Sequence, residues 1–437
     1  MIRIGRCCLL LSLLTCTPAK SEDGPEAGSA DPAAQFSRKV LLRQFDRNRD
    51  GRLNDKETSV LRDAFGGIDV PMLPDESYDY THVDRPGSIT PEQLRNADNT
   101  PEGNPLTNPG ATLGRVLLYD RQLSENGAVS CASCHDQKAA FADPRRFSIG
   151  FNGERTRRNS MGLTNIRYTH LKGRRPGFFW DERAPTLEAQ ALMPIQDEIE
   201  MGMKLKDLNK KLGKLPYYPP LFAAAFGSTE ITSERIARAL AQFMRSMVSL
   251  RSKFDRAAAA AAEKDDNSTD FDLFTAQENL GKSLFMEGIG GIAEFGCAVC
   301  HPPPTFNMDK AQNVGLDLKY RDKGLGALGR QSNEPFTPSN DGKFKASSLR
   351  NIALTAPYMH DGRFKTLDQV VKHYSSGVQP HPNLGLAPRE EEFGAPGTGF
   401  HLSKDEQAAL VAFLRTLTDD QFVSDPRFSD PFVRAPH

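Results

Sequence analysis

Apolar residues recur at helical spacing along much of the chain, whereas stretches that alternate apolar and polar residues are few. The segment that begins at Ser233 places a stripe of apolar residues along one helix face: Ile236, Leu240, Phe243, Met244, Met247 and Leu250. A last helix is predicted after Ser403, because Ser403-Lys404-Asp405-Glu406 is a capping box ahead of an apolar run. The pattern therefore predicts a mainly α-helical fold.

One helical pattern occurs twice, which indicates an internal duplication. Residues 113–119 and 280–286 both begin with leucine, glycine and a basic residue, and apolar residues follow. Each copy precedes a C-x-x-C-H motif, with 17 positions from Gly114 to Cys131 and 16 from Gly281 to Cys297. The duplication predicts two related domains, each opened by a helix that leads to its motif.

The repeated motif carries the most specific chemistry of the sequence. Its two copies are Cys131-Ala132-Ser133-Cys134-His135 and Cys297-Ala298-Val299-Cys300-His301. In c-type haem proteins, the two thiols bond the haem and the adjacent histidine ligates the iron. A redox dithiol and a four-cysteine zinc site are the alternatives. Neither explains the histidine that follows each pair, and zinc sites space their cysteine pairs more closely. Two covalent haem c groups are therefore predicted.

An N-terminal segment matches the calcium-binding loop of an EF-hand. Residues 46–57 fit all of its defining positions, with ligands expected from Asp46, Asn48, Asp50, the carbonyl of Arg52, Asn54 and Glu57. The alternative is a turn that is merely rich in Asp and Asn. A degenerate second loop carries His82, Pro86 and Gln93 where ligands would lie. It is predicted to be a structural mate that binds no calcium.

Composition and charge exclude some partners and indicate the compartment. Formal net charge is −1, from 55 basic and 56 acidic residues, so no positive field is available for nucleic acid. The basic cluster Arg155, Arg157 and Arg158 is predicted to be a solvated loop. Residues 1–19 resemble a secretory signal that is too short to span a bilayer, which predicts a periplasmic or secreted protein without a transmembrane span. A lipid anchor on Cys16 is the alternative.

The remaining cysteines are all committed to the haem motifs. Three of the seven cysteines lie in the signal segment, and the other four lie in the two motifs, so no disulfide is predicted. The predicted organisation follows from these features: signal peptide 1–19, linker 20–35, EF-hand pair 36–98, first haem domain 105–270, second haem domain 271–421 and tail 422–437.

Three residues after the first motif are candidates for peroxide chemistry. Trp180, Gln190 and Glu200 follow one another at intervals of ten. A peroxidase needs an open iron face with a carboxyl or imidazole group beside it, which moves a proton between the two peroxide oxygens. Spacing alone leaves the alternatives open, since a lone tryptophan is often core and Glu200 could be a surface charge.

The chain resembles the bacterial diheme cytochrome c peroxidase/MauG family across about residues 105–421. The resemblance rests on the segments CASCHD, RNSMGLTN, FFWDERAPTLEAQALMPI, EIEMG, SSLRNIALTAPYMHDGRFKTL and VVKHY. It implies that Glu200 is the acid/base residue over the first haem and that Gln190 lines the same pocket. It also implies that Trp180 relays electrons between the haems. Calcium between the haem domains is implied at Asn165, Thr355 and Pro357.

Two departures from the ordinary peroxidases of that family favour its MauG-like branch. Residues 145–164 contain no histidine that could block the first iron, and His170 lies after Asn165. The first iron is therefore expected to be five-coordinate. At the second haem the match places Tyr374 where ordinary members have an axial methionine, and Met359 is the competing ligand. An anionic tyrosinate suits a haem that stores an oxidising equivalent.

Together these features predict a diheme c-type peroxidase that reduces hydrogen peroxide and oxidises a partner protein. One alternative is an ordinary cytochrome c peroxidase that takes electrons from a small redox protein. A second is a diheme electron carrier without enzymatic activity.

Overall fold

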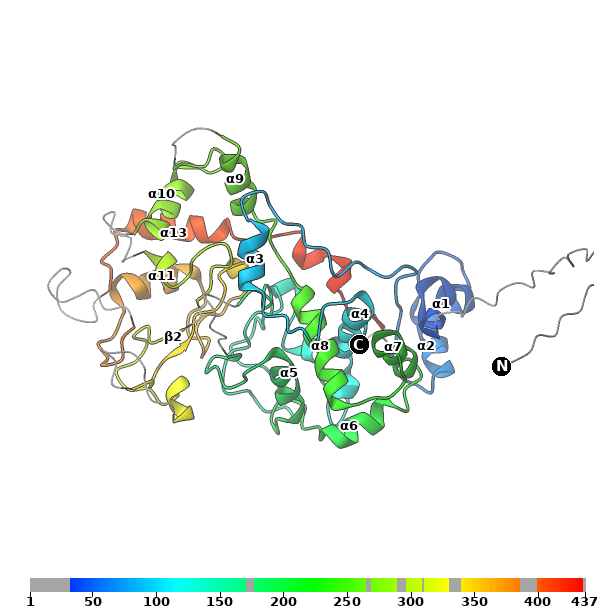
Figure 1. The fold of residues 1–437 in the computed structure, drawn as a ribbon. Helices are drawn as coiled ribbons and strands as arrows, with labels where there is room; N and C mark the ends of the chain where they lie inside the picture. Colours follow the sequence, from blue (N-terminus) through cyan, green and yellow to red (C-terminus); the bar gives the residue numbers. More distant parts are fainter. Residues whose placement is uncertain are drawn as a thin grey trace, which may run out of the picture. The chain divides into compact units, whose positions relative to one another are not determined.

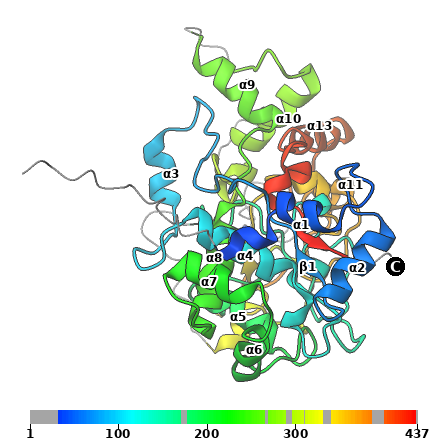
Figure 2. The same ribbon diagram turned by 90° about the vertical axis from the view of Figure 1, so that its right-hand side faces the viewer.

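The computed structural model describes residues 32–169, 177–264, 269–288, 296–308, 310–329, 339–385 and 399–434. The predicted signal peptide, the larger part of the predicted linker and His170 lie outside these residues. Helices dominate the described residues, and the strands are two residues long each (Figures 1 and 2). The mainly α-helical fold predicted from the sequence is confirmed.

Helices form the framework of the segment from Asn108 to Ser246. These are α4 (Asn108–Tyr119), α5 (Leu187–Gln196), α6 (Leu205–Leu212), α7 (Tyr218–Phe226) and α8 (Ser233–Ser246). Helices α4 and α8 cross at Gly114, where a Cβ atom would lie only 2.0 Å from the Ala239 carbonyl oxygen. The predicted stripe is buried, including Met244 and Met247, but α8 ends at Ser246, so Met247 and Leu250 lie beyond the helix. These methionines therefore belong to the core.

The second half repeats this crossing with its own helices. They are α9 (Lys253–Ala262), α10 (Ala276–Met286), α11 (Leu367–Ser376) and α13 (Lys404–Arg415). Gly281 of α10 meets α13, and a Cβ there would lie 2.0 Å from the Ala409 carbonyl oxygen. The capping box predicted at Ser403 and Glu406 is present at the start of α13. Each duplicated glycine thus permits the same close helix contact.

Two separate apolar cores follow from the two helix pairs. The second core contains Phe285 and Phe413, whose ring centroids are 4.9 Å apart. Phe254 of α9 belongs to this core, although the predicted domain boundary lies after α9. The C-terminal segment returns to the first core through Phe422 and Phe428.

The N-terminal segment is a helix-loop-helix that is tied to the end of the chain. Helices α1 (Arg38–Phe45) and α2 (Asp55–Ala64) flank the predicted calcium loop. Strand β1 (Val70–Pro71) then pairs antiparallel with β4 (Phe432–Val433), in register Val70 with Val433.

The second loop of the predicted EF-hand pair is not confirmed. Residues 72–90 contain no helix that would enter it, and only the following helix α3 (Pro91–Ala97) is present. Helix α3 packs Leu94 and Ala97 into a small cluster with Tyr168 and Leu250. Its apolar face is therefore directed toward the haem-domain segments.

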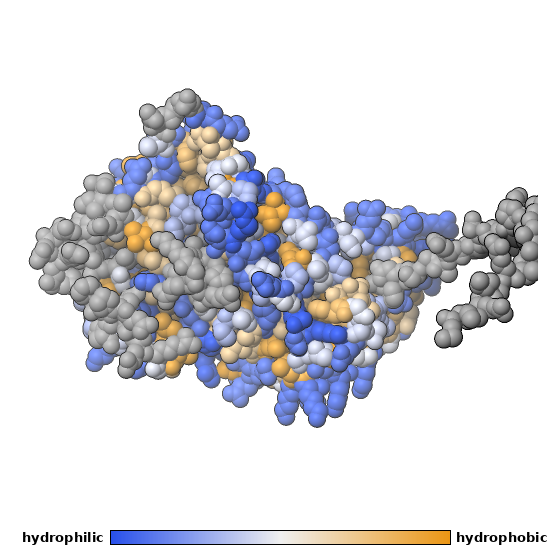
Figure 3. Space-filling model, viewed as in Figure 1, coloured by the Kyte–Doolittle hydropathy of each residue, from blue (hydrophilic) through white to orange (hydrophobic). Residues whose placement is uncertain are grey.

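Short elements complete the described residues. Strands β2 (Ala311–Gln312) and β3 (Phe344–Lys345) pair antiparallel, in register Ala311 with Lys345. The 3-10 helices are η1 (Pro32–Phe36), η2 (Arg121–Leu123), η3 (Cys131–Ser133), η4 (Gln137–Ala139), η7 (Cys297–Val299), η8 (Leu325–Leu328), η9 (Ile352–Leu354), η10 (Phe422–Ser424) and η11 (Pro426–Phe428). Among the described helices, none is both long and apolar enough to cross a membrane. On the face in Figure 3, apolar side chains form small groups between hydrophilic ones.

Candidate haem centres

One cavity of about 1030 Å³ connects the two C-x-x-C-H motifs. Its lining includes the cysteines and histidines of both motifs, which are Cys131, Cys134, His135, Cys297, Cys300 and His301. Each pair of cysteines spans a 3-10 turn, η3 in the first motif and η7 in the second. The duplicated motifs therefore face a common interior space.

Both histidines are oriented to present one ring nitrogen to a metal. The Nδ1 atom of His135 lies 2.8 Å from the Phe141 carbonyl oxygen, and that of His301 lies 3.0 Å from the Phe306 carbonyl oxygen. Phe141 and Phe306 both have positive φ, 60° and 53°, so the same backbone turn supplies the acceptor twice. A carbonyl partner fixes the proton on Nδ1 and leaves Nε2 as the ligand.

The ionisation of these groups also fits haem attachment. Burial lowers the pKa of both histidines, which favours the neutral imidazole that ligates iron. All four motif cysteines are free of disulfides. Burial raises the pKa of Cys131 and Cys297 to about 12, so both thiols are un-ionised at neutral pH. The residues present fit two haem c groups.

Glu200 and Gln190 line the same cavity as the first motif. Gln190 lies on α5, and Glu200 follows in a turn where the Asp197 carboxylate accepts the amides of Ile199 and Glu200, at 2.9 and 3.1 Å. The Oε1 atom of Gln190 is buried and has no hydrogen-bond partner. A buried polar atom without a partner is costly, so this oxygen or its amide is available to a ligand in the cavity.

Burial raises the pKa of Glu200 to about 7, and the neighbouring charge of Asp197 adds to the effect. Arg183 acts in the opposite direction and lowers it. A carboxyl group that titrates near neutral pH can both accept and return a proton. All three predicted catalytic residues, Trp180, Gln190 and Glu200, line the cavity.

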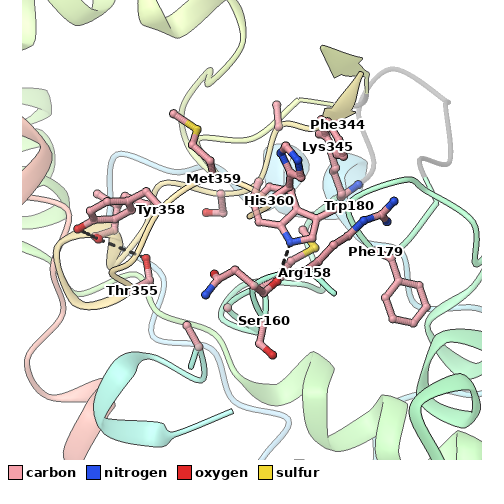
Figure 4. A pocket seen from close by; sticks show the side chains of 18 of the residues that line it. Arg158, Ser160, Phe179, Trp180, Phe344, Lys345, Thr355, Tyr358, Met359 and His360 are labelled. Atoms are coloured by element: carbon pink, nitrogen blue, oxygen red, sulfur yellow. Dashed lines mark hydrogen bonds between the residues drawn. The ribbon is translucent and has the colours of Figure 1, made fainter. Parts of the chain in front are cut away.

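Trp180 joins the two halves of the cavity wall. Its indole nitrogen donates to the Asn159 carbonyl oxygen at 2.8 Å, and its own carbonyl accepts the Lys345 amide of β3 at 2.8 Å. Beside it, His360 stacks on Phe344 with ring centroids 3.6 Å apart (Figure 4). Trp180 therefore contacts segments from both halves of the chain.

Arg158 was predicted to be solvated, and this prediction is wrong. Its side chain is 20% exposed, and its guanidinium group binds Asp181 and Asp322, each at 2.6 Å. Arg155 and Arg157 are exposed, as predicted. The difference arises because Asp322 lies far along the chain, where no local pattern reveals it as a partner.

The two candidate ligands of the second haem both line the cavity. Tyr374 lies on α11, and Met359 lies in the turn before Asp361 with φ of 72°. Burial raises the pKa of Tyr374 above its ordinary value, so the phenol keeps its proton unless a metal binds its oxygen. Both residues remain candidates.

The predicted inter-haem calcium ligands share the cavity wall as well. Asn165, Thr355 and Pro357 all line it. The Asn165 side chain exchanges two hydrogen bonds of 2.9 Å with the backbone of Ser249. Within the described ranges, no three side chains of His, Cys, Asp or Glu form a metal-binding group. This calcium stays a prediction.

In the EF-hand loop, side chains of the predicted calcium ligands accept hydrogen bonds from backbone amides. The Glu57 carboxylate accepts the amides of Arg47, Asn48 and Asn54, at 2.8, 3.3 and 3.0 Å. Asp46 accepts the Gly51 amide at 2.9 Å. Asn54 caps α2 with Glu57 in a capping box. The loop therefore has defined local structure, and its calcium stays a prediction too.

Two C-x-x-C-H motifs line one cavity, and each has a histidine next to its second cysteine. This arrangement defines a c-type cytochrome with two haem sites. Comparison with known proteins gives its family. A sequence profile described as di-haem cytochrome c peroxidase matches residues 108–263. The chain is 35% identical over 318 residues to the methylamine utilization protein MauG of Methylorubrum extorquens. The aligned residues cover 72% of this chain and 80% of the relative.

Two further likenesses agree with this match. Cytochrome c551 peroxidase of Nitrosomonas europaea is 33% identical over 325 residues, 74% of this chain and 83% of the relative. The crystal structure of a MauG-like protein associated with microbial copper homeostasis superposes with a TM-score of 0.61 and 31% identity, over 80% of this chain and 99% of that chain. The protein belongs to the diheme cytochrome c peroxidase/MauG family.

Proposed function

We propose that the chain is a secreted or periplasmic peroxidase that reduces hydrogen peroxide at its first haem, with Glu200 as the acid/base residue. The observation that carries the proposal is the position of Glu200. Its carboxyl group lines the cavity with Cys131 and Cys134, and burial raises its pKa to about 7. A surface glutamate would remain ionised well below that pH.

Each motif would hold one haem through its two cysteines and its histidine Nε2. The haems supply iron that exchanges electrons with peroxide and with the final reductant. The Phe141 and Phe306 carbonyls orient His135 and His301, and burial favours their neutral form. Gln190 and Glu200 line the same cavity as His135 and would face the group held there.

Gln190 and Glu200 perform the proton transfer. One carboxyl oxygen of Glu200 takes a proton from the peroxide and returns it to the departing oxygen, so a single group serves as base and then acid. The unpartnered Gln190 side chain orients the peroxide by a hydrogen bond. The cavity wall is otherwise rich in apolar side chains, which strengthens these polar contacts.

Tyr374 is proposed as the second axial ligand at the second site, with Met359 as the alternative. A phenolate oxygen favours the higher oxidation states of iron, which suits MauG-like storage of an oxidising equivalent and oxidation of a partner protein. Trp180 is proposed to relay electrons between the two sites, because it contacts both halves of the cavity wall. If Met359 is the ligand, a small redox protein is the favoured electron donor.

Two calcium sites complete the proposal. One is the EF-hand loop 46–57, where Asp46, Asn48, Asp50, Arg52, Asn54 and Glu57 would bind the ion. The other lies between the haem domains at Asn165, Thr355 and Pro357, which share the cavity wall.

The test compares Glu200→Gln with Glu198→Gln, a neighbouring exposed carboxylate. The rate constant for reaction of the ferric protein with hydrogen peroxide is measured by stopped-flow absorbance. Glu200→Gln should lose about 10²–10⁴-fold, the usual contribution of a general acid/base group, and Glu198→Gln should match the wild type. Equal rates in the wild type and Glu200→Gln would remove Glu200 from the mechanism. Haem absorbance unmoved by peroxide in the wild type would favour the electron carrier.

A further inference from the structure

Residues 148–160 form a loop that contacts both Glu200 and Trp180. The loop is closed at its base, where the hydroxyl groups of Ser148 and Ser160 lie 2.8 Å apart. Ser148 and Thr156 exchange further hydrogen bonds of 3.0 Å across it. Ile149 and Arg155 form an isolated antiparallel bridge. These cross-connections make the 148–160 loop a single stiff unit.

At one end, the 148–160 loop is fastened to the backbone of Glu200. The Phe151 amide donates to the Glu200 carbonyl oxygen at 3.0 Å. Gly150 packs so closely that a Cβ atom would lie 1.6 Å from the Ile199 carbonyl oxygen. The Phe151 ring lies against Gly202, and the Phe151 carbonyl accepts the Asn126 side chain at 2.8 Å. With any residue larger than glycine at 150, the loop and the Glu200 turn must move apart.

At the other end, the same loop holds the indole ring of Trp180. The Asn159 carbonyl accepts the indole N–H at 2.8 Å, and the buried Asn159 side chain donates to the Arg145 carbonyl at 3.1 Å. Arg158 binds Asp181, the residue after Trp180, and Asp322 of the second half. Asn159 therefore holds the indole directly, and Arg158 holds the residue that follows Trp180.

We propose that the 148–160 loop is one positioning element that sets the Glu200 carboxyl group and the Trp180 indole together. The inference rests on the proposed roles of these two residues. Gly150, Phe151, Arg158 and Asn159 act through them and take no part in the chemistry themselves. Hydrogen bonds connect the two ends of the loop. A displacement at Gly150 is therefore transmitted to Trp180, and one at Arg158 is transmitted to Glu200.

The test perturbs each end with a matched control. Gly150→Ala forces a Cβ against Ile199, whereas Gly103→Ala adds one where nothing lies within 4 Å. Arg158→Lys removes the planar fork that binds two carboxylates, whereas Arg155→Lys changes an exposed residue of the same loop. Phe151→Ala replaces Gly150→Ala if that variant does not fold, because it removes the ring against Gly202 and keeps the backbone amide.

Each holoprotein is measured in two ways. The first is the pH profile of the rate constant with hydrogen peroxide, which reports on Glu200. The second is the ultraviolet resonance Raman spectrum of tryptophan, which reports on the hydrogen bond and torsion of the indole. Trp180 is the one tryptophan in the chain, so its bands need no assignment.

We expect both loop variants to move both measurements. The peroxide rate constant should fall about 10–100-fold with a displaced pH inflection, as small misplacements of catalytic groups do, and the indole bands should shift. Both controls should match the wild type. Variants that leave both measurements unchanged, or that each alter only their own end, would overturn the inference. A normal peroxide reaction in Glu200→Gln would instead refute the proposed function, and the Raman bands would still test the loop.

Discussion

The raised pKa of Glu200 determines how the rate constant with hydrogen peroxide changes with pH. The carboxyl group keeps its proton below about pH 7 and cannot then accept one from peroxide. We expect the rate constant with hydrogen peroxide to rise about tenfold per pH unit in acid and to level off above about pH 7. Stopped-flow measurements across this range test it. Glu200→Gln should be flat, and a wild-type profile without an inflection would contradict the assignment.

The choice between Tyr374 and Met359 is also a question about single residues. Replacement of Tyr374 by Phe removes an anionic oxygen donor, so the reduction potential of the second haem should rise and its ferric spectrum should change. Met359→Leu should alter neither. Spectroelectrochemical titration measures both quantities. The opposite pattern, with Met359→Leu altering the potential, would assign the ligand to Met359.

How well residue roles could be predicted depended on the distance of their partners along the chain. Cys131, Cys134 and His135 are neighbours whose spacing alone specifies haem attachment. Arg158 was misjudged because Asp322 is 164 positions away and reaches it only after folding. The same holds for Gly150 and Phe151, whose contact with Glu200 has no sequence signature.

The duplicated glycines, Gly114 and Gly281, mark the two helix crossings, α4 with α8 and α10 with α13. Gly281→Ala would force a Cβ to within 2.0 Å of the Ala409 carbonyl oxygen, so α10 and α13 must separate. We expect the free energy of unfolding to fall by about 1–3 kcal/mol, the usual cost of overpacking. Gly103→Ala is the control, and thermal or denaturant unfolding gives the comparison. Equal stability of Gly281→Ala and the wild type would show that the crossing can relax.

Helices were easier to predict than the way they pair. Capping residues and apolar stripes identified α8 and α13, because these signals lie within each helix. The EF-hand pair was not confirmed, because a degenerate loop leaves no ligand pattern from which to infer an entering helix. Helix α3 packs instead with Tyr168 and Leu250, contacts that depend on the tertiary fold.

At the scale of the whole molecule, the N-terminal helix-loop-helix is joined to the end of the chain. Strand β1 pairs with β4, and Arg434 binds Asp69 at 3.2 Å and the Tyr119 carbonyl at 2.7 Å. Calcium in the loop should therefore stabilise the fold that holds the first haem, by about 2.7 kcal/mol at a hundred times its dissociation constant.

Calcium removal tests this coupling. A chelator should lower the melting temperature of the wild type, and Glu57→Gln should lose the part of that response that comes from the 46–57 loop, because its bidentate ligand is gone. Glu76→Gln, an exposed carboxylate outside the loop, is the control. A melting temperature that is independent of calcium in the wild type would argue against both predicted calcium sites.

The central claim is that the first iron keeps an open coordination position beside the Glu200 carboxyl group. Electron paramagnetic resonance of the resting ferric protein, before and after addition of hydrogen peroxide, measures this most directly. The account predicts one high-spin and one low-spin haem, with the high-spin signal lost when peroxide is added. Two low-spin signals that peroxide leaves unchanged would contradict it.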